Sequence, residues 1–187
     1  MTARVALTYQ DYAALPDDGK RYEIHDGELS VTPAPMSDHQ IVIGNLFMIL
    51  APHVKARSLG LVILAPLDVI LSNTTIVQPD LVYLDPERLP ALHGRGVEGP
   101  PTLAIEVLSP TTGTTDRTTK RDLYARYGVP YLWLVDPKVR VIEAYVLRGG
   151  EYALAVRAAG GQALDLQPFV DLGLVPDLLW PPFSLAP

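Results

Sequence analysis

Short stretches in which apolar and polar residues alternate, or in which β-branched residues run together, predict a chain rich in β-strands. The residues on both sides of Asp26-Gly27 alternate in this way, and that dipeptide is typical of a hairpin turn. Two longer apolar runs, joined by a polar turn at 72–74, have the composition of central strands. They contain Pro66 and Pro79, where we expect a bulge or a partly unpaired strand. The expected strands lie within residues 21–33, 61–71, 75–84, 102–109, 131–137, 139–147 and 151–158.

Apolar residues spaced three and four positions apart predict three helices. Thr8 is placed to cap the N-terminus of the first helix. The second contains Pro52, which we expect to kink or end it. The third follows a threonine-rich loop, with Thr115 or Asp116 as its N-cap and Gly128 as its C-cap. These helices lie within residues 7–17, 39–57 and 111–129.

The order of these elements is helix, hairpin, helix, and then strands around one central helix. It indicates an α/β fold of the mixed α+β type, with a central mixed β-sheet flanked by helices. A chain of 187 residues can bury one core, so we expect a single domain over residues 1–187. Residues 85–101 have the composition of a loop. From about residue 163 the chain is apolar and rich in proline, and we expect this tail to pack on the body or on a partner subunit.

Composition places the chain among globular proteins, since 48% of its residues are hydrophobic and 19% are charged. No apolar run reaches the roughly 20 residues of a membrane helix, and the start lacks the apolar core of a secretory signal. We therefore expect a cytoplasmic protein without membrane contact. Because the chain has no cysteine, disulfides, thiolate catalysis and cysteine-bound metals are excluded. A net charge of −6 argues against broad, non-specific affinity for nucleic acid, but it is compatible with a local basic groove.

Two carboxylates stand inside apolar, strand-like runs: Asp80 in QPDLVYL and Glu106 in LAIEVLS. Burying a carboxylate is costly unless something pairs with it. Lys120 on the following helix is one such partner, and a divalent cation is another. Together these groups fit phosphodiester hydrolysis, in which a metal polarises the phosphoryl oxygen and a cation stabilises developing charge. Three plainer interpretations stay open: Asp80 caps a bulge, Glu106 forms a structural ion pair, and Lys120 lies on a helix surface.

Four further residues are candidates for substrate binding or for support of this site. His39, at the start of the second helix, could bind a phosphate or assist proton transfer, or could simply bond to nearby backbone. Asp68 is another acid within a strand, with a supporting or structural role. Arg117 and Arg121 belong, with Lys120 and Arg126, to a basic cluster that is either a local phosphate-binding groove or a solvated helix face.

The segments QPDLVYL and IEVLSPTTGTTDRTTKRDLYARYGVPYLWLVDP make this chain similar to the Uma-two family of restriction-endonuclease-like proteins, within the PD-(D/E)XK nuclease superfamily. The similarity runs from about residue 8 to residue 147. It implies a restriction-endonuclease-like core with Asp80 and Glu106 as metal ligands and the Val107 backbone carbonyl as a third oxygen. The superfamily's usual lysine stands two residues after the glutamate, where this chain has Leu108. The resemblance therefore implies that the catalytic lysine has moved to Lys120.

The same resemblance assigns Glu23 to an acidic position that could hold a second metal or a water. The resulting hypothesis is an endonuclease that depends on Mg²⁺ or Mn²⁺ and acts on DNA rather than RNA. We expect a homodimer, because cutting two strands suits a two-fold arrangement. The alternative is a non-catalytic module of the same fold that binds nucleic acid or protein. The acidic net charge and the displaced lysine favour that alternative.

Overall fold

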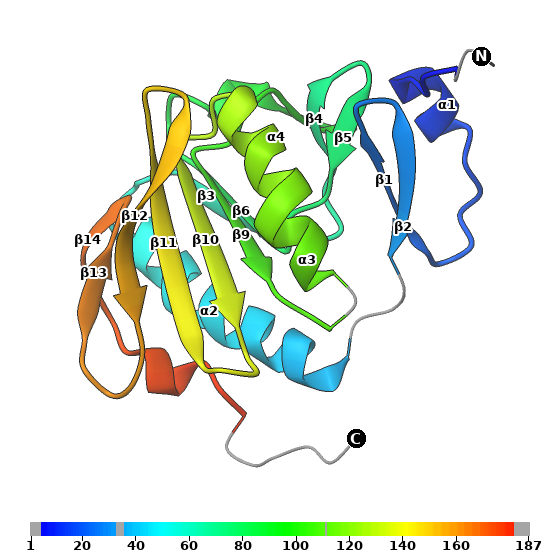
Figure 1. The fold of residues 1–187 in the computed structure, drawn as a ribbon. Helices are drawn as coiled ribbons and strands as arrows, with labels where there is room; N and C mark the ends of the chain where they lie inside the picture. Colours follow the sequence, from blue (N-terminus) through cyan, green and yellow to red (C-terminus); the bar gives the residue numbers. More distant parts are fainter. Residues whose placement is uncertain (1–4, 33–35, 111, 182–187) are drawn as a thin grey trace.

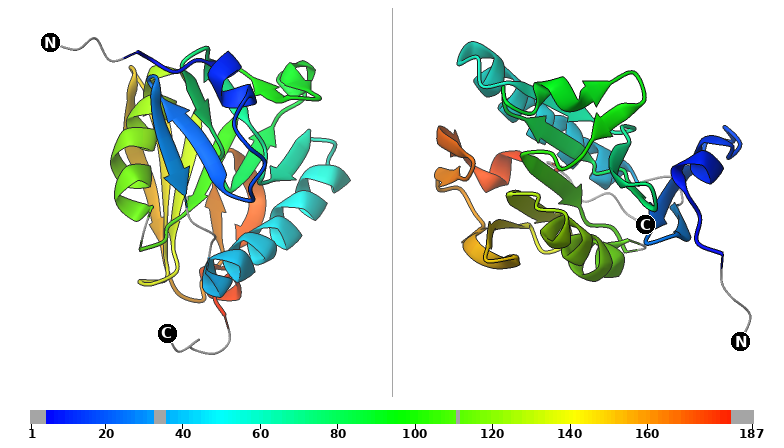
Figure 2. Two further views of the ribbon diagram at one scale, coloured as in Figure 1. Left: turned by 90° about the vertical axis from the view of Figure 1, so that its right-hand side faces the viewer. Right: turned by 90° about the horizontal axis from the view of Figure 1, so that it is seen from above.

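The computed structural model describes residues 5–32, 36–110 and 112–181, and its centre is a six-stranded mixed sheet (Figure 1). The strand order is β12-β11-β10-β9-β6-β3. Strands β9 and β10 run parallel, and the other neighbours are antiparallel. Helices cover both faces of this sheet (Figures 1 and 2), which confirms the expected mixed α+β fold. In the same order, the strands are Glu151–Ala158, Val141–Arg148, Tyr131–Asp136, Leu103–Val107, Leu81–Leu84 and Leu61–Leu64.

The two faces of the central sheet bury two apolar clusters. Helix α2 (Ser37–Ala56) packs on one face, where its buried leucines meet residues such as Ile105 of β9. On the other face lies a continuous helical segment, made of α3 (Gly113–Thr115), the π-helical η2 (Asp116–Lys120) and α4 (Arg121–Arg126). Leu123 of α4 packs there against the opposite face of the sheet. Period-two alternation along β9 thus assigns alternate residues to different cores.

A second six-stranded sheet, in the order β2-β1-β5-β4-β8-β7, continues two runs of the central sheet. We expected residues 61–71 and 75–84 to be two central strands, and this was wrong: each run forms one strand in each sheet. The chain changes sheet at Pro66 and at Pro79, since proline has no N–H to donate to a ladder. The strands of the second sheet, in order, are Glu28–Thr32, Arg21–His25, Thr75–Val77, Val69–Ser72, Gly96–Glu98 and Leu92–His93.

The N-terminal elements match the expectations from local sequence. Thr8 caps helix α1 (Tyr9–Ala13) in a reciprocal capping box with Asp11. Strands β1 and β2 form the antiparallel hairpin expected at Asp26-Gly27. Both turn residues have positive φ, which suits this dipeptide. Residues 85–101, expected to be a loop, instead contain the short helix η1 (Leu89–Ala91) and the hairpin of β7 and β8.

Two expected helix boundaries are not found in the structure. Helix α2 does not end at Pro52, because this proline leaves only the Met48 carbonyl without its helical donor, and Met48 lies on the solvent side of the helix. Thr115 and Asp116 do not cap the third helix, which begins at Gly113. The Ser109 hydroxyl accepts the Thr112 N–H and holds the preceding turn, so the helix starts earlier. Gly128, with positive φ, follows the end of α4 as expected.

The apolar tail packs on the body up to residue 181. It contains β13 (Leu164–Leu166), β14 (Phe169–Leu174) and η3 (Pro176–Leu178), and residues 182–187 lie outside the described residues. Leu179 and Trp180 are buried in the cluster beside α2, where Asn45 Nδ2 donates to the Leu179 carbonyl at 3.0 Å. Within the described ranges, no helix is long and apolar enough to cross a membrane.

Candidate functional site

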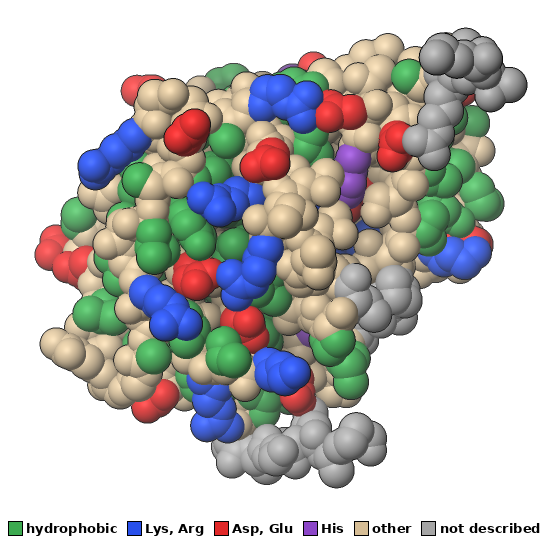
Figure 3. Space-filling view, viewed as in Figure 1, with side chains coloured by type: hydrophobic (Ala, Val, Ile, Leu, Met, Phe, Trp, Pro, Cys, Tyr) green, Lys and Arg blue, Asp and Glu red, His purple; other side chains and the backbone are tan. Residues whose placement is uncertain are grey.

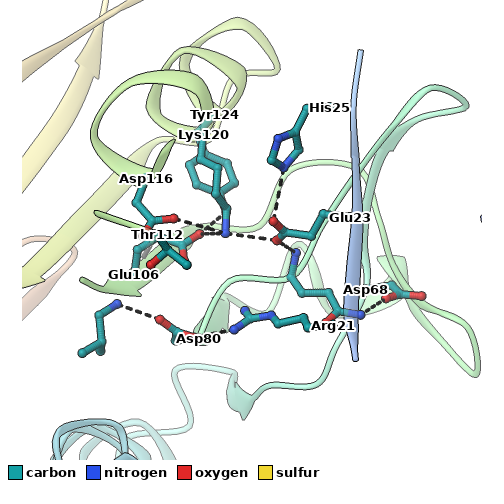
Figure 4. Close-up of polar contacts among 12 residues, drawn as sticks. Arg21, Glu23, His25, Asp68, Asp80, Glu106, Thr112, Asp116, Lys120 and Tyr124 are labelled. Atoms are coloured by element: carbon teal, nitrogen blue, oxygen red, sulfur yellow. Dashed lines mark hydrogen bonds and ion pairs between the residues drawn. The ribbon is translucent and has the colours of Figure 1, made fainter. Parts of the chain in front are cut away.

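A cleft of about 480 Å³ opens where the β1–β2 hairpin faces the ends of the central strands and the start of the third helix. The close-up in Figure 4 shows charged side chains from all of these elements converging on it. The cleft brings together four of the carboxylates and the lysine from separate parts of the chain. Its ionisable lining residues are Arg21, Glu23, His39, Asp80, Glu106, Asp116 and Lys120.

Asp80 stands just before β6, at the point where the chain passes from one sheet to the other, and it is 2% exposed. The Val107 N–H donates to its Oδ2 at 2.7 Å, and His39 Nε2 lies 3.2 Å from the same oxygen. Arg21 Nη1 donates to Oδ1 at 2.9 Å. Burial alone would raise the pKa of Asp80, but the hydrogen bond from His39 and the charge of Arg21 outweigh it and hold the pKa below its usual range. Asp80 is therefore ionised in the folded protein.

Glu106, in the middle of the buried strand β9, faces the third helix. Its Oε1 accepts a hydrogen bond from the Tyr124 hydroxyl at 2.5 Å and lies 2.6 Å from Lys120 Nζ. Burial raises the pKa of this carboxyl to about 8, against the lowering effect of the Lys120 charge and with further upward contributions from Asp116 and Asp80. Glu106 therefore holds a proton more readily than Asp80, and two nearby carboxyls differ in charge because their environments differ.

Lys120 is 3% exposed and joins three carboxylates. Besides Glu106, its Nζ lies 3.1 Å from Glu23 Oε1 and 3.8 Å from Asp116 Oδ1. Burial alone would lower the pKa of this ammonium group, but the charges of Glu106 and Glu23 outweigh it and raise the pKa. Lys120 closes the π-helical turn, a kind of irregularity that is frequent at functional sites. The structure thus places this lysine in contact with the strand glutamate although it comes from the next helix.

Glu23 of β1 lies closer to the centre of the cluster than its sequence context suggested. Its Oε1 accepts the backbone N–H of Gln78 at 2.6 Å and contacts Lys120, while His25 Nε2 lies 3.2 Å from Oε2. Burial would raise the pKa of Glu23, but the Lys120 charge and the hydrogen bond from His25 hold it well below its usual range. Glu23 is therefore a fixed negative charge that positions the lysine.

Sequence patterns missed Arg21 and Tyr124 as site residues and assigned Asp116 to a helix cap. Tyr124 packs in the core, and its hydroxyl reaches Glu106. Asp116 is buried beside Lys120, and burial raises the pKa of its carboxyl. Arg21 and Asp116 sit in polar stretches, so local hydropathy could not identify them.

The cleft suits a divalent cation by charge. Four carboxylates face two permanent cations, Arg21 and Lys120, which leaves a net charge of −2 when all the acids are ionised. Among the described residues, no three His, Asp or Glu side chains form a ready-made metal cluster. Mg²⁺ does not need one, because it is commonly held by one or two carboxylates with water and substrate phosphate. Asp80 and Glu106 provide two such carboxylates in one cleft. Val107 contacts Asp80 here through its N–H. The role of its carbonyl as a metal ligand stays a prediction.

Asp68, Arg117 and Arg121 do not line this cleft. Asp68 accepts hydrogen bonds from the Tyr12 hydroxyl at 2.6 Å and from Gln78 Nε2 at 2.8 Å. The backbone N–H of Gln78 in turn donates to Glu23. Asp68 therefore supports the cleft indirectly, by holding Gln78 in place.

The two arginines of the third helix are half-buried and turn toward strands β10, β11 and β12. Arg117 pairs with Glu143 and Asp136, and Arg121 lies over the Tyr145 ring. Figure 3 shows basic and acidic side chains mixed over this face. Because both arginines are engaged by residues of the sheet, their arrangement fits a structural role better than a phosphate groove.

Two comparisons relate the chain to known proteins. The family model Uma2, described as "Putative restriction endonuclease", matches residues 9–179. The chain is also similar to a crystal structure described as a "putative nuclease belonging to DUF820" from Anabaena variabilis ATCC 29413. The TM-score is 0.74 at 20% identity, over 92% of this chain and 97% of that chain. At this identity the likeness establishes the fold. Comparison with curated proteins gave no match.

Proposed function

Because the chain belongs to the Uma2 family, described as "Putative restriction endonuclease", we propose that it is a nuclease that hydrolyses phosphodiester bonds with a divalent cation. The observation that carries this proposal is the meeting of Asp80, Glu106 and buried Lys120 in one cleft. Alternate residues of β9 serve two apolar cores, yet the strand also carries a carboxylate that contacts a lysine. A structure with no use for these charges would be expected to avoid the cost of burying them.

Asp80 and Glu106 are the proposed ligands of Mg²⁺ or Mn²⁺, with the Val107 carbonyl as a third oxygen. The bound cation would polarise the phosphoryl oxygen and make its bound water more acidic. Asp80 is ready for this role, because its pKa is held low. Glu106 has to lose its proton first, and Lys120 beside it favours the ionised form.

Lys120 is the proposed group that stabilises charge developing on the phosphate or orients the attacking water. Its ammonium is preorganised, because Glu23 and Asp116 contact it in addition to Glu106. Glu23 therefore acts as a positioning residue for the lysine, and a role as ligand of a second metal remains a further proposal. His39 lines the cleft with Nδ1 buried and without a partner among the described residues, so it is a candidate to contact a phosphate.

The proposed substrate is nucleic acid, with DNA preferred over RNA, and the proposed working form is a homodimer that can act on both strands. The negative net charge means that affinity has to come from the cleft and its cation rather than from a broad basic surface. Arg117 and Arg121 are mostly engaged within the protein, which supports the view that affinity does not come from a broad basic surface.

The test is cleavage of plasmid and of single-stranded DNA in Mg²⁺ or Mn²⁺ by the wild type and three variants. Asp80→Asn and Glu106→Gln keep the shape of each side chain and remove its charge. Asp85→Asn is the matched control, because Asp85 follows the same strand but pairs with Arg88 outside the cleft. We expect cleavage by the wild type and by the control, and none by the two cleft variants. Cleavage that persists in both cleft variants would contradict the assignment.

A binding module without catalysis is the alternative outcome. It would be supported by nucleic-acid binding that is unaffected by chelation of divalent cations, together with no cleavage by folded wild-type protein. The internal pairing of Lys120 with three carboxylates is compatible with such a module, so the metal dependence decides between the two functions.

A further inference from the structure

Arg21 is the charged residue of the cleft whose hydrogen bonds are least complete. It begins strand β1, two residues before Glu23, and its guanidinium reaches across to Asp80, as Figure 4 shows. Its Nη1 donates to Asp80 Oδ1 at 2.9 Å. Its Nε and Nη2 are buried, and no described residue accepts a hydrogen bond from either. A buried donor without a partner is unfavourable, so this arrangement points to a second state in which the donors are used.

The arginines outside the cleft show the contrast. Arg126 binds Asp26 through both terminal nitrogens, and Arg117 binds two different carboxylates. Both side chains are more exposed than that of Arg21, and each uses the two-pronged geometry that a guanidinium offers. Arg21, which is more buried, uses one nitrogen on one oxygen. If Arg21 had only a structural role, we would expect its N–H donors to have more hydrogen-bond partners than those of the more exposed arginines.

The two oxygens of Asp80 are held very differently. Oδ2 accepts from the Val107 backbone N–H and contacts His39, so it is tied to strand β9. For Oδ1 the described partner is Arg21, on a long and flexible side chain. A metal ion approaching Asp80 can therefore displace Arg21 from Oδ1 without breaking a backbone contact. A cation has to be replaced by a cation there, because the cleft is net negative.

We propose that Arg21 substitutes for the divalent cation on Asp80 Oδ1 in the metal-free protein, and that it binds the substrate phosphodiester once metal takes that oxygen. This inference rests on the proposed function. The freed guanidinium has five donors and stands in the cleft beside Lys120, where a phosphate would meet both. Arg21 thus couples metal binding to phosphate binding, because the arginine that leaves Asp80 is the one that grips the substrate.

The coupling predicts opposite effects of one substitution. Arg21→Gln removes the competing cation, so Mn²⁺ titrated into the protein without nucleic acid should bind about tenfold more tightly, the size of a modest coupling between sites. The same variant should bind a short DNA duplex about tenfold more weakly in Ca²⁺, another cation that takes oxygen ligands. A merely structural arginine would not move the two affinities in opposite directions.

Two further variants keep the test decisive. Lys20→Gln removes the neighbouring cation, which is 59% exposed and pairs with Asp18, and it should change neither affinity more than about twofold. Arg21→Lys keeps a positive charge beside Asp80 but loses the two-pronged donor geometry of the guanidinium. Its Mn²⁺ affinity should therefore stay near that of the wild type, while its affinity for DNA should fall. If Arg21→Gln does not fold, the pattern in Arg21→Lys decides.

Calorimetry for Mn²⁺ and fluorescence anisotropy for the duplex give both numbers on the full chain. Unchanged affinities in the Arg21 variants, or a loss of both affinities together, would overturn the proposal for Arg21. The proposed function fails separately, if the wild type shows no Mn²⁺ binding or if Asp80→Asn does not reduce it. A wild type that binds Mn²⁺ through Asp80 while Arg21→Gln behaves identically would overturn only the role of Arg21.

Discussion

The two faces of strand β9 differ, although their residues alternate along one short segment: one face is wholly apolar, and the other carries a glutamate among apolar residues. Leu103, Ile105 and Val107 point toward α2 and join an apolar cluster. Ala104 and Glu106 point toward the third helix, where Glu106 meets Lys120 and Tyr124. The difference is local, because the helix on the second face brings the lysine and the tyrosine to the glutamate.

This contrast separates what stabilises the fold from what equips the cleft. On the α2 face, stability follows from burial of apolar area. On the other face, the free energy that the charged groups gain by pairing mainly offsets the free energy that they lose when they leave water. The ion pairs are therefore weak evidence for stability and stronger evidence for function. Substitutions on the charged face should therefore change metal binding and cleavage as well as stability, whereas substitutions on the α2 face should change stability alone.

The largest effect is expected for Lys120→Met. It leaves Glu23, Glu106 and Asp116 without their shared cation, and we expect a loss of about 3–5 kcal/mol in the free energy of unfolding at neutral pH. Part of the loss should be recovered at lower pH, where the carboxyls take up protons. Denaturant unfolding at both pH values measures this.

The exposed Lys138→Met serves as the control for Lys120→Met and should stay within about 0.5 kcal/mol of the wild type. A similarly small effect in Lys120→Met would mean that the lysine does not hold the cluster together.

On the apolar face, Ile105→Ala should cost about 2–5 kcal/mol of stability, since Ile105 is fully buried and its loss leaves a cavity. Its affinity for Mn²⁺ should equal that of the wild type below the unfolding transition, because the side chain points away from the cleft. A large loss of Mn²⁺ affinity in folded Ile105→Ala would show that the two faces are not independent.

Glu23→Gln tests positioning within the cleft. The amide keeps the shape but weakens the hold on Lys120, so we expect cleavage to slow by about 10–100-fold, as for residues that support a catalytic or metal-bound group. Glu28→Gln, on the paired strand of the same hairpin and outside the cleft lining, is the comparison variant and should cleave at the rate of the wild type. Equal rates in the two variants would remove Glu23 from the site.

The last expected effect is a pH dependence of metal binding. The pKa of Glu106 is raised to about 8, so below that pH a proton competes with metal for the carboxylate. Mn²⁺ affinity should rise from pH 6 to pH 8 by up to about tenfold per pH unit and then level off. Calorimetry across this range measures it, and Glu106→Gln should flatten the profile. A profile that falls with rising pH would contradict the assignment.

Much of the architecture was predictable because its causes are local. The hairpin at Asp26-Gly27, the cap at Thr8 and the strand around Glu106 follow from nearby residues. The division of residues 61–84 between two sheets was not predictable in this way. Pro66 and Pro79 marked an irregularity, but composition does not tell which neighbour a strand finds beyond it.

For the site, the same distinction holds. Asp80 and Glu106 could be found because each is a charge in an apolar run. Lys120 could be found because it lies on the next predicted helix as a partner for them, and the family resemblance supported that link. Arg21 lies 59 positions from Asp80 in sequence, and the two meet only because the fold places the start of β1 at the cleft. Long-range pairing of this kind leaves no local pattern.

The most direct test of the account is the position of Mn²⁺ in crystals of this protein, located by its anomalous scattering. We predict a peak that contacts the carboxylates of both Asp80 and Glu106, with Arg21 displaced from Asp80 Oδ1. A structure at the same Mn²⁺ concentration with no metal in the cleft, and with Arg21 and Lys120 still on their carboxylates, would contradict it.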